Sequence, residues 1–180
     1  MRVFISIEIS DGNVLKRIQT FQENLEINGK ATRINQIHFT LQFLGEIDGK
    51  QCEKVKDVLN EIAFPQFELF LKGVGGFPNL NDPRIIWVGT SKGGEKLSEI
   101  AKEIGIKLTN LGFKENKKFK PHLTVFRIKK KIGDISSLMQ EYETVEFGSE
   151  TVSKIKLKKS VLSPDGPEYS DLLEVNANEK

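Results

Sequence analysis

The chain has 180 residues, of which 38% are hydrophobic and 29% charged, a composition that supplies a sizeable core and argues against general disorder. Its formal net charge is only +2, so nucleic-acid binding cannot be inferred from the overall charge. The single cysteine, Cys52, excludes an internal disulfide, and no apolar stretch approaches the ~18 residues of a membrane span, so we predict one cytoplasmic domain over residues 1–180.

The first half of the chain predicts three strands and two helices. The first helix follows a Ser10 or Asp11 cap, and Gly45 and Asp48-Gly49 end the strand before the second helix. The expected elements are a strand over 2–9, a helix that buries Val14, Ile18, Phe21 and Leu25, a strand over 36–44, a helix that buries Val55, Leu59 and Ile62, a strand over 67–74 and a loop over 75–83.

The second half repeats this order of elements. It predicts a strand over 84–89, a helix over 95–111, a strand from His122, a short helix over 135–142, and strands near Val145, over 152–162 and over 169–175. We therefore expect two similar lobes, approximately 1–80 and 81–180, between which strands can exchange. Such lobes would face each other and bring distant residues together across a groove.

The two histidines of the chain have the same neighbours, in His38-Phe39-Thr40-Leu41 and in His122-Leu123-Thr124-Val125. In a strand, each His and the Thr two residues later lie on one face, and the apolar residues point inward. Threonine makes up 8 of 180 residues, so chance places it at both positions only about 0.2% of the time. The repetition favours a shared chemical role over two structural histidines.

Two histidines with hydroxyl partners suit the cleavage of a phosphodiester without a metal. The imidazole pKa of about 6.5 allows one His to be a protonated acid while the other is a neutral base. One would take a proton from the attacking water or hydroxyl, and the other would give a proton to the leaving oxygen. Thr40 and Thr124 would donate hydrogen bonds to the non-bridging phosphate oxygens. The residues alone do not decide which histidine has which role.

Other chemistries find less support in the sequence. It contains no His-Glu-x-x-His or paired Cys-x-x-Cys motif for zinc, and neither of the glycine-rich patterns that bind nucleotide phosphates. Composition leaves a metal bound by carboxylates open, but no acidic cluster accompanies either motif. We therefore expect neither a metal ion nor another cofactor.

Positive charge gathers around the second motif. Residues 114–131 include eight lysines and arginines against one acid, Glu115, and such a segment attracts phosphate groups. Arg127 is expected to contact phosphate through its guanidinium fork, although strict alternation places it opposite His122, so that it needs a bulge or a strand end. Phe126 shares the face of His122, where it either stacks on a base or packs in the core.

Five segments together resemble the two-histidine phosphoesterase superfamily and, within it, the RNA 2',3'-cyclic phosphodiesterases, also called 2'-5' RNA ligases. These are residues 1–8, 37–46, 84–89, 120–127 and 166–169, which follow the family order and span nearly the whole chain. Neither His-x-Thr-x motif departs from the family pattern.

The resemblance implies a bilobal α+β fold with a pseudo-two-fold axis, in which two antiparallel-sheet lobes with outer helices enclose a central catalytic groove. It implies hydrolysis of a 2',3'-cyclic phosphate on RNA to a 2'-phosphate, with His38 as the proton donor and His122 as the base. It also implies the reverse reaction, 2'-5' ligation of tRNA halves. We expect a monomer. Two alternatives stay open: an RNA-end binding module without turnover, and a phosphodiesterase for small nucleotide-derived cyclic phosphates.

Overall fold

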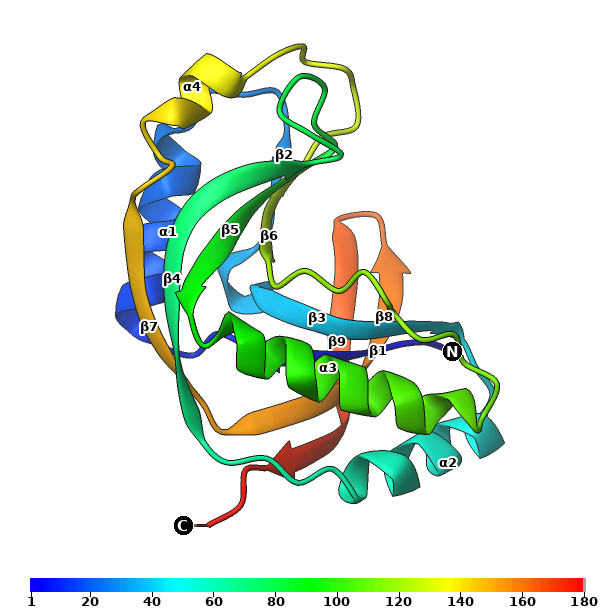
Figure 1. Cartoon of the computed structure of the whole chain (residues 1–180). Coiled ribbons are helices and arrows are strands. Elements are labelled where there is room, and N and C mark those ends of the chain that lie inside the picture. The colour runs from blue at the N-terminus through cyan, green and yellow to red at the C-terminus, as the bar shows by residue number, and fades with distance from the viewer. Residues whose placement is uncertain (180) are drawn as a thin grey trace.

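Alternating apolar residues form strands that pair antiparallel into one curled sheet, as the computed structural model of residues 1–179 shows (Figure 1). The strands are β1 (Arg2–Glu8), β2 (Lys30–Ala31), β3 (His38–Glu46), β4 (Phe67–Phe77), β5 (Ile85–Lys92), β6 (Leu123–Arg127), β7 (Glu146–Val152), β8 (Lys154–Ser163) and β9 (Gly166–Asn176). The helices are α1 (Gly12–Asn24), the 3-10 turn η1 (Ile34–Gln36), α2 (Gly49–Asn60), α3 (Gly94–Thr109) and α4 (Ser136–Gln140). The predicted α+β class is confirmed.

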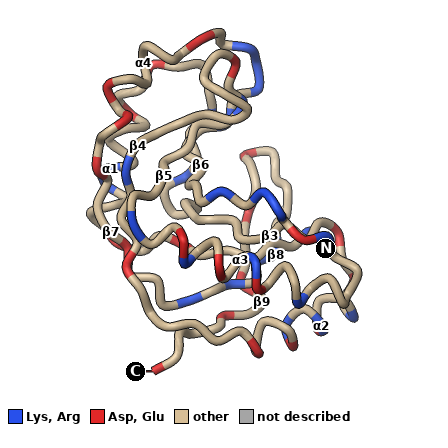
Figure 2. Tube along the Cα trace, viewed as in Figure 1, with Lys and Arg blue, Asp and Glu red and all other residues tan. Residues whose placement is uncertain are grey.

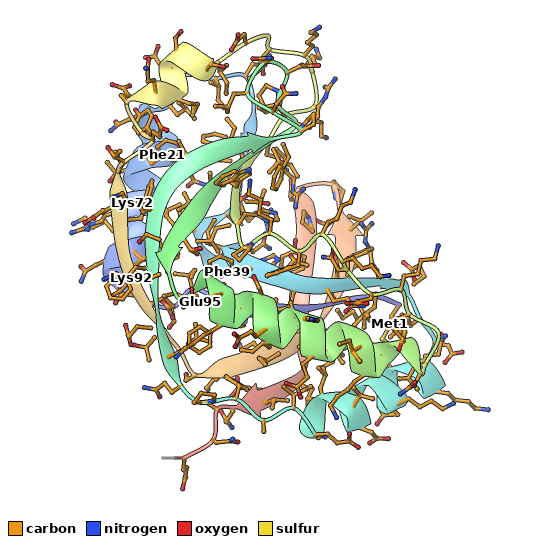
Figure 3. The ribbon with its side chains drawn as sticks, in the orientation of Figure 1. Met1, Phe21, Phe39, Lys72, Lys92 and Glu95 are labelled. Carbon is orange, nitrogen blue, oxygen red and sulfur yellow. The ribbon has the colours of Figure 1, made fainter. Side chains whose placement is uncertain are left out.

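The sheet has two halves that join at the two motif strands. Its strand order is β7-β4-β5-β6-β3-β1-β8-β9, with β2 paired to β6. The link between β3 and β6 is the pairing of Phe39 with Leu123, the residues that directly follow the two histidines. Figure 3 shows Phe39 near the centre of the molecule, and its side chain is fully buried. The topology therefore brings His38 and His122 to the same place.

Each half of the sheet combines early and late parts of the chain. β1 pairs with β3 and with β8, whereas β4 pairs with β5 and with β7. A boundary at residue 80 therefore does not separate the two halves, because strands from both sides of it contribute to each half.

Capping residues determine where the first two helices begin. The carboxylate of Asp11 accepts hydrogen bonds from the backbone N–H groups of Asn13 (3.0 Å) and Val14 (2.9 Å) at the start of α1. Asp48 and Gln51 form a capping box at the start of α2. Figure 1 shows α1 beside β7, and α2 and α3 together against the other half of the sheet. No helix within residues 1–179 is long and apolar enough to cross a membrane.

One expectation about the strands needs correction, and one short strand was not expected. The expected strands near Val145 and over 152–162 correspond to β7, which begins at Glu146, and to β8, which begins at Lys154. β4 runs to Phe77 and so includes the first three residues of the expected loop. The short β2 was not expected at all, because two residues are too few to show a periodic pattern.

Candidate active site

Both histidine motifs line one pocket where the two halves of the sheet meet. His38 and Thr40 project from β3, Thr124 projects from β6, and His122 directly precedes β6. The apolar residues of the two motifs are fully buried: Phe39, Leu41, Leu123 and Val125. The alternation predicted from the sequence therefore holds within each motif, and the structure brings the four polar side chains together.

The two imidazoles are anchored in the same way. Nδ1 of His38 lies 2.7 Å from the carbonyl oxygen of Gln36, and Nδ1 of His122 lies 2.6 Å from the carbonyl oxygen of Lys120. A carbonyl oxygen only accepts, so each Nδ1 carries a proton that it donates, and Nε2 is left as the nitrogen that can accept or release a proton. Nε2 of His38 lies 3.1 Å from Oγ1 of Thr40. The site thus offers two oriented Nε2 atoms, as acid–base chemistry requires.

Aromatic rings fix the planes of both histidines. The Phe4 ring is tilted against His38 at a centroid distance of 5.1 Å, and Tyr169 meets the same imidazole edge to face at 5.6 Å. Phe77 meets His122 edge to face at 4.8 Å, and Trp87 packs behind Phe77 at 5.5 Å. Such contacts restrict rotation of the imidazoles about their side-chain bonds.

A bulge follows the threonine of each motif. The strand register passes from Ser6↔Thr40 to Ile5↔Gln42 on β3, and from Trp87↔Thr124 to Ile86↔Phe126 on β6. One extra residue on each motif strand reverses the alternation beyond it. The residue three positions after each threonine therefore returns to the pocket face. These two residues are Phe43 and Arg127.

The bulge on β6 places only one of the two side chains predicted to contact the substrate on the pocket face. Arg127 is exposed and lines the pocket. It reaches the face of His122 through a bulge, one of the two possibilities that its position in the sequence required. Phe126 is only 4% exposed, belongs to the core and does not line the pocket. The stacking role considered for Phe126 is therefore wrong, and core packing is its role.

A cluster of four charges lies beside His38. Glu8, which is opposite His38 in the sheet, bonds Lys158 and, at 2.7 Å, Lys156. Asp171 accepts from the same two lysines at 2.8 Å (Lys156) and 2.7 Å (Lys158). Two positive and two negative charges therefore cancel next to the imidazole, and Lys158 is only 7% exposed.

The surroundings lower the pKa of both histidines below the ordinary value of 6.5. Burial is the main cause in each, because it disfavours the charged imidazolium. The hydrogen bonds from Nδ1 to the carbonyl oxygens raise the pKa and so oppose burial. Lys158 lowers the pKa of His38 further, and Glu8 raises it. The neutral form of each histidine is favoured near neutral pH.

Within residues 1–179, no group of three or more His, Cys, Asp or Glu side chains is arranged to hold a metal ion. The carboxylates of the charge cluster beside His38, Glu8 and Asp171, are occupied by ion pairs with lysines.

Comparison with known proteins agrees with this site. Residues 2–171 match the family described as the AKAP7 2'5' RNA ligase-like domain. The chain belongs to this family. It is 40% identical over 181 residues to the RNA 2',3'-cyclic phosphodiesterase of Methanocaldococcus jannaschii, with 97% of this chain and 99% of the relative covered. It is 36% identical over 174 residues to the protein of the same name from Archaeoglobus fulgidus, with 96% and 98% covered.

Solved structures share this fold. The structure of E. coli LigT complexed with 3'-AMP has a TM-score of 0.82 and 21% identity, over 99% of this chain and 98% of that chain. TT0787 of Thermus thermophilus has a TM-score of 0.80 and 25% identity, over 98% and 97%. Together with the family match, these likenesses confirm the expected relation to the two-histidine phosphoesterases.

This member of the 2'-5' RNA ligase-like family has two further arms beside its histidines. The basic arm, Lys30 and Arg33, belongs to the pocket that both motifs line. The aromatic arm, Phe4 and Phe43, belongs to an adjoining pocket, which Leu162 also lines. This pocket shares His38, Thr40 and Arg127 with the first. Sequence reasoning missed both arms, because their residues reach the site only through bulges and long-range pairing. Tyr169 was quoted only as part of a family segment, yet it lines both pockets.

Proposed function

We propose that the protein hydrolyses RNA 2',3'-cyclic phosphodiester ends to 2'-phosphomonoesters without a metal ion. The observation that carries this proposal is the matched pair of imidazoles, each with Nδ1 fixed on a carbonyl oxygen so that Nε2 remains for proton transfer, in one pocket that also contains Thr40 and Arg127. The relatives named RNA 2',3'-cyclic phosphodiesterase support the same substrate.

In the proposed mechanism, water attacks the cyclic phosphorus and the bond to the 3' oxygen breaks. Neutral His122 takes a proton from the water through Nε2, and protonated His38 donates the Nε2 proton to the departing 3' oxygen. Thr40, Thr124 and Arg127 hold the non-bridging oxygens, on which negative charge builds up in the transition state. Each proton transfer is worth about 10²- to 10⁴-fold in rate. The assignment of acid and base follows the family resemblance.

The aromatic arm offers a place for the terminal base. Phe43 is 52% exposed, unusual for a phenylalanine in a strand, and Arg2 lies over its ring at 4.9 Å. Stacking of a base on an aromatic ring is worth about 1–3 kcal/mol and tolerates any base. We therefore expect contact with the nucleobase without strong base selectivity. Because one chain supplies both motifs, a monomer would be active.

A second reaction, 2'-5' ligation of RNA halves such as cleaved tRNA, would use the same proton transfers with another nucleophile. A ribose 5'-hydroxyl would replace water, His122 would take its proton, and the 3' oxygen would again leave with a proton from His38. Ligation therefore needs a second RNA end near His122, and an excess of water favours hydrolysis.

The test is to incubate the purified protein and EDTA with a short RNA that ends in a 2',3'-cyclic phosphate. We expect 2'-phosphate as the product and a fall of at least about 10²-fold in His38→Ala and in His122→Ala. Near-normal turnover in both variants would exclude the two-histidine mechanism. Activity that disappears with EDTA and returns with a divalent cation would exclude metal independence.

The same assay separates the remaining alternatives. RNA that binds but keeps its cyclic end for hours would support a binding module. Faster turnover of a mononucleoside cyclic phosphate than of the RNA would support a phosphodiesterase for small cyclic phosphates.

A further inference from the structure

Two cations of the catalytic pocket have no place in the proposed mechanism. Lys30 of β2 and Arg33 of the following loop line the pocket together with Arg127. Nζ of Lys30 and Nη2 of Arg33 both donate to the backbone carbonyl oxygen of Asp165, at 2.8 and 3.0 Å. Within residues 1–179 neither forms an ion pair, in contrast to Lys156 and Lys158 beside His38.

The strand register places these cations close to Arg127. Lys30 is directly opposite Arg127 in the β2–β6 pairing, so both side chains leave the sheet on one face. Like charges directly opposite each other destabilise a strand pair. The arrangement becomes favourable when an anion lies between the cations, so the register indicates an anion site that extends from Arg127 to Lys30.

The charge of the pocket exceeds what one cyclic phosphate needs. The pocket residues carry three positive charges, on Lys30, Arg33 and Arg127, and one negative charge, on Asp165. A 2',3'-cyclic phosphate has a single negative charge, which Arg127 and the two threonine hydroxyls accommodate. The next anion along an RNA chain is the phosphodiester on the 5' side of the terminal nucleotide.

We propose that Lys30 and Arg33 bind this 5' phosphodiester, so that the enzyme favours RNA ends over isolated cyclic nucleosides. The phosphate oxygens would replace the Asp165 carbonyl as the acceptor, and hydrogen bonds between charged groups are about twice as strong as neutral ones. This assignment rests on the proposed function and specifies its substrate. Figure 2 shows further positive charge in the loop that follows β6, where lysines occupy positions 129–131. We expect a longer RNA to extend toward this loop.

The test compares adenosine 2',3'-cyclic phosphate with the same molecule that carries a 5'-phosphate. We expect kcat/KM of the wild-type protein to be about tenfold higher for the 5'-phosphorylated substrate, because hydrogen bonds between charged groups are strong but solvent weakens them at these two exposed cations. In Lys30→Gln/Arg33→Gln the two substrates should become nearly equal. The matched control Lys50→Gln/Lys54→Gln removes two exposed charges from α2 and should keep the preference.

The ratio of the two rates separates substrate binding from a structural role. If Lys30 and Arg33 only tether the turn at Asp165, the double variant will lose rate on both substrates alike and the ratio will stay unchanged, which overturns the assignment. Equal rates in the wild-type protein overturn it as well.

Calorimetric titration measures phosphate binding by Lys30 and Arg33 without turnover. It therefore tests this binding even if neither substrate is hydrolysed and the proposed function fails. Adenosine 2',5'-bisphosphate should bind about tenfold more tightly than 2'-AMP, and the difference should vanish in Lys30→Gln/Arg33→Gln. Equal affinities of the wild-type protein for the two nucleotides would overturn the anion site.

Discussion

Gly75 allows the aromatic packing behind His122, and a single methyl group at this position should disturb it. Gly75 of β4 is opposite Trp87 of β5, and the indole ring covers the glycine. A Cβ at position 75 would lie 2.2, 2.5 and 2.7 Å from three ring carbons of Trp87, far inside the ordinary contact range of 3.4–4 Å. Gly75→Ala must therefore displace the ring, because the backbone of Gly75 itself is compatible with alanine.

The structure gives the size of this displacement and its consequence. Restoring 3.4 Å from 2.2 Å requires a shift of about 1.2 Å of the nearest ring atom. Trp87 packs against Phe77, and Phe77 packs against His122, so the shift reaches the imidazole that is proposed as the general base. Overpacking of this kind costs about 1–3 kcal/mol of unfolding free energy. A misplacement of about 1 Å at a catalytic group lowers the rate by up to about 10²-fold.

The assay uses the fact that Trp87 is the single tryptophan of the chain. Urea unfolding followed by tryptophan fluorescence should give a lower midpoint for Gly75→Ala, and kcat/KM for a cyclic-phosphate RNA should fall at least tenfold. Gly49→Ala is the matched control, since no atom lies within 4 Å of its Cβ at the start of α2, and it should be neutral or slightly stabilising. Adding Trp87→Phe should relieve the clash and recover part of the stability, which is then measured by circular dichroism because this variant has no tryptophan.

An unchanged midpoint and an unchanged fluorescence maximum for Gly75→Ala would refute this reasoning, because both report directly on the ring that must move. An unchanged midpoint with a large loss of rate would also contradict it, since the cost of overpacking would be missing.

The remaining predictions concern protonation and stability. Burial lowers the pKa of both histidines, and the proposed mechanism requires a protonated His38, so the pH profile of kcat/KM should have its maximum below pH 6.5; a maximum above about pH 7.5 would contradict this. Lys158→Met removes a charge that lowers the pKa of His38, so the alkaline limb should move to higher pH. The same variant should lose about 1–2 kcal/mol in urea unfolding, less than for a fully buried pair because Glu8 keeps Lys156 and is 32% exposed. Asp48→Ala removes the capping box and should cost about 1 kcal/mol at unchanged kcat/KM, and an unchanged midpoint would argue against the cap.

The sequence predicted the parts of the molecule that depend on local patterns. Apolar spacing identified the helices, and the buried Val14, Ile18 and Phe21 of α1 lie behind the Asp11 cap as expected. The two motifs predicted their own inward and outward faces, because alternation holds over four residues whatever the partner strand. The family resemblance supplied the arrangement of the two sheet halves, which periodicity alone does not contain.

The rest of the site depends on pairing between distant residues. The bulges after Thr40 and Thr124 exchange the faces of the residues beyond them, and no propensity marks a bulge of this kind in advance. Phe126 was therefore assigned to the wrong face, and Phe43 was overlooked. Lys30 reaches Arg127 through a two-residue strand whose partner is nearly a hundred positions away. Periodicity in a single window of sequence cannot reveal such a neighbour.

The single pairing of Phe39 with Leu123 sets the distance between His38 and His122, so this distance depends on the weakest connection between neighbouring strands of the sheet. Each half of the sheet is held internally by several paired residues per strand, whereas β3 and β6 share this one pair within residues 1–179. A small hinge motion at this seam would separate His38 from His122 while leaving both halves folded. On heating, activity should therefore be lost at a lower temperature than the folded structure. The difference between the two temperatures would measure the stability of the β3–β6 connection.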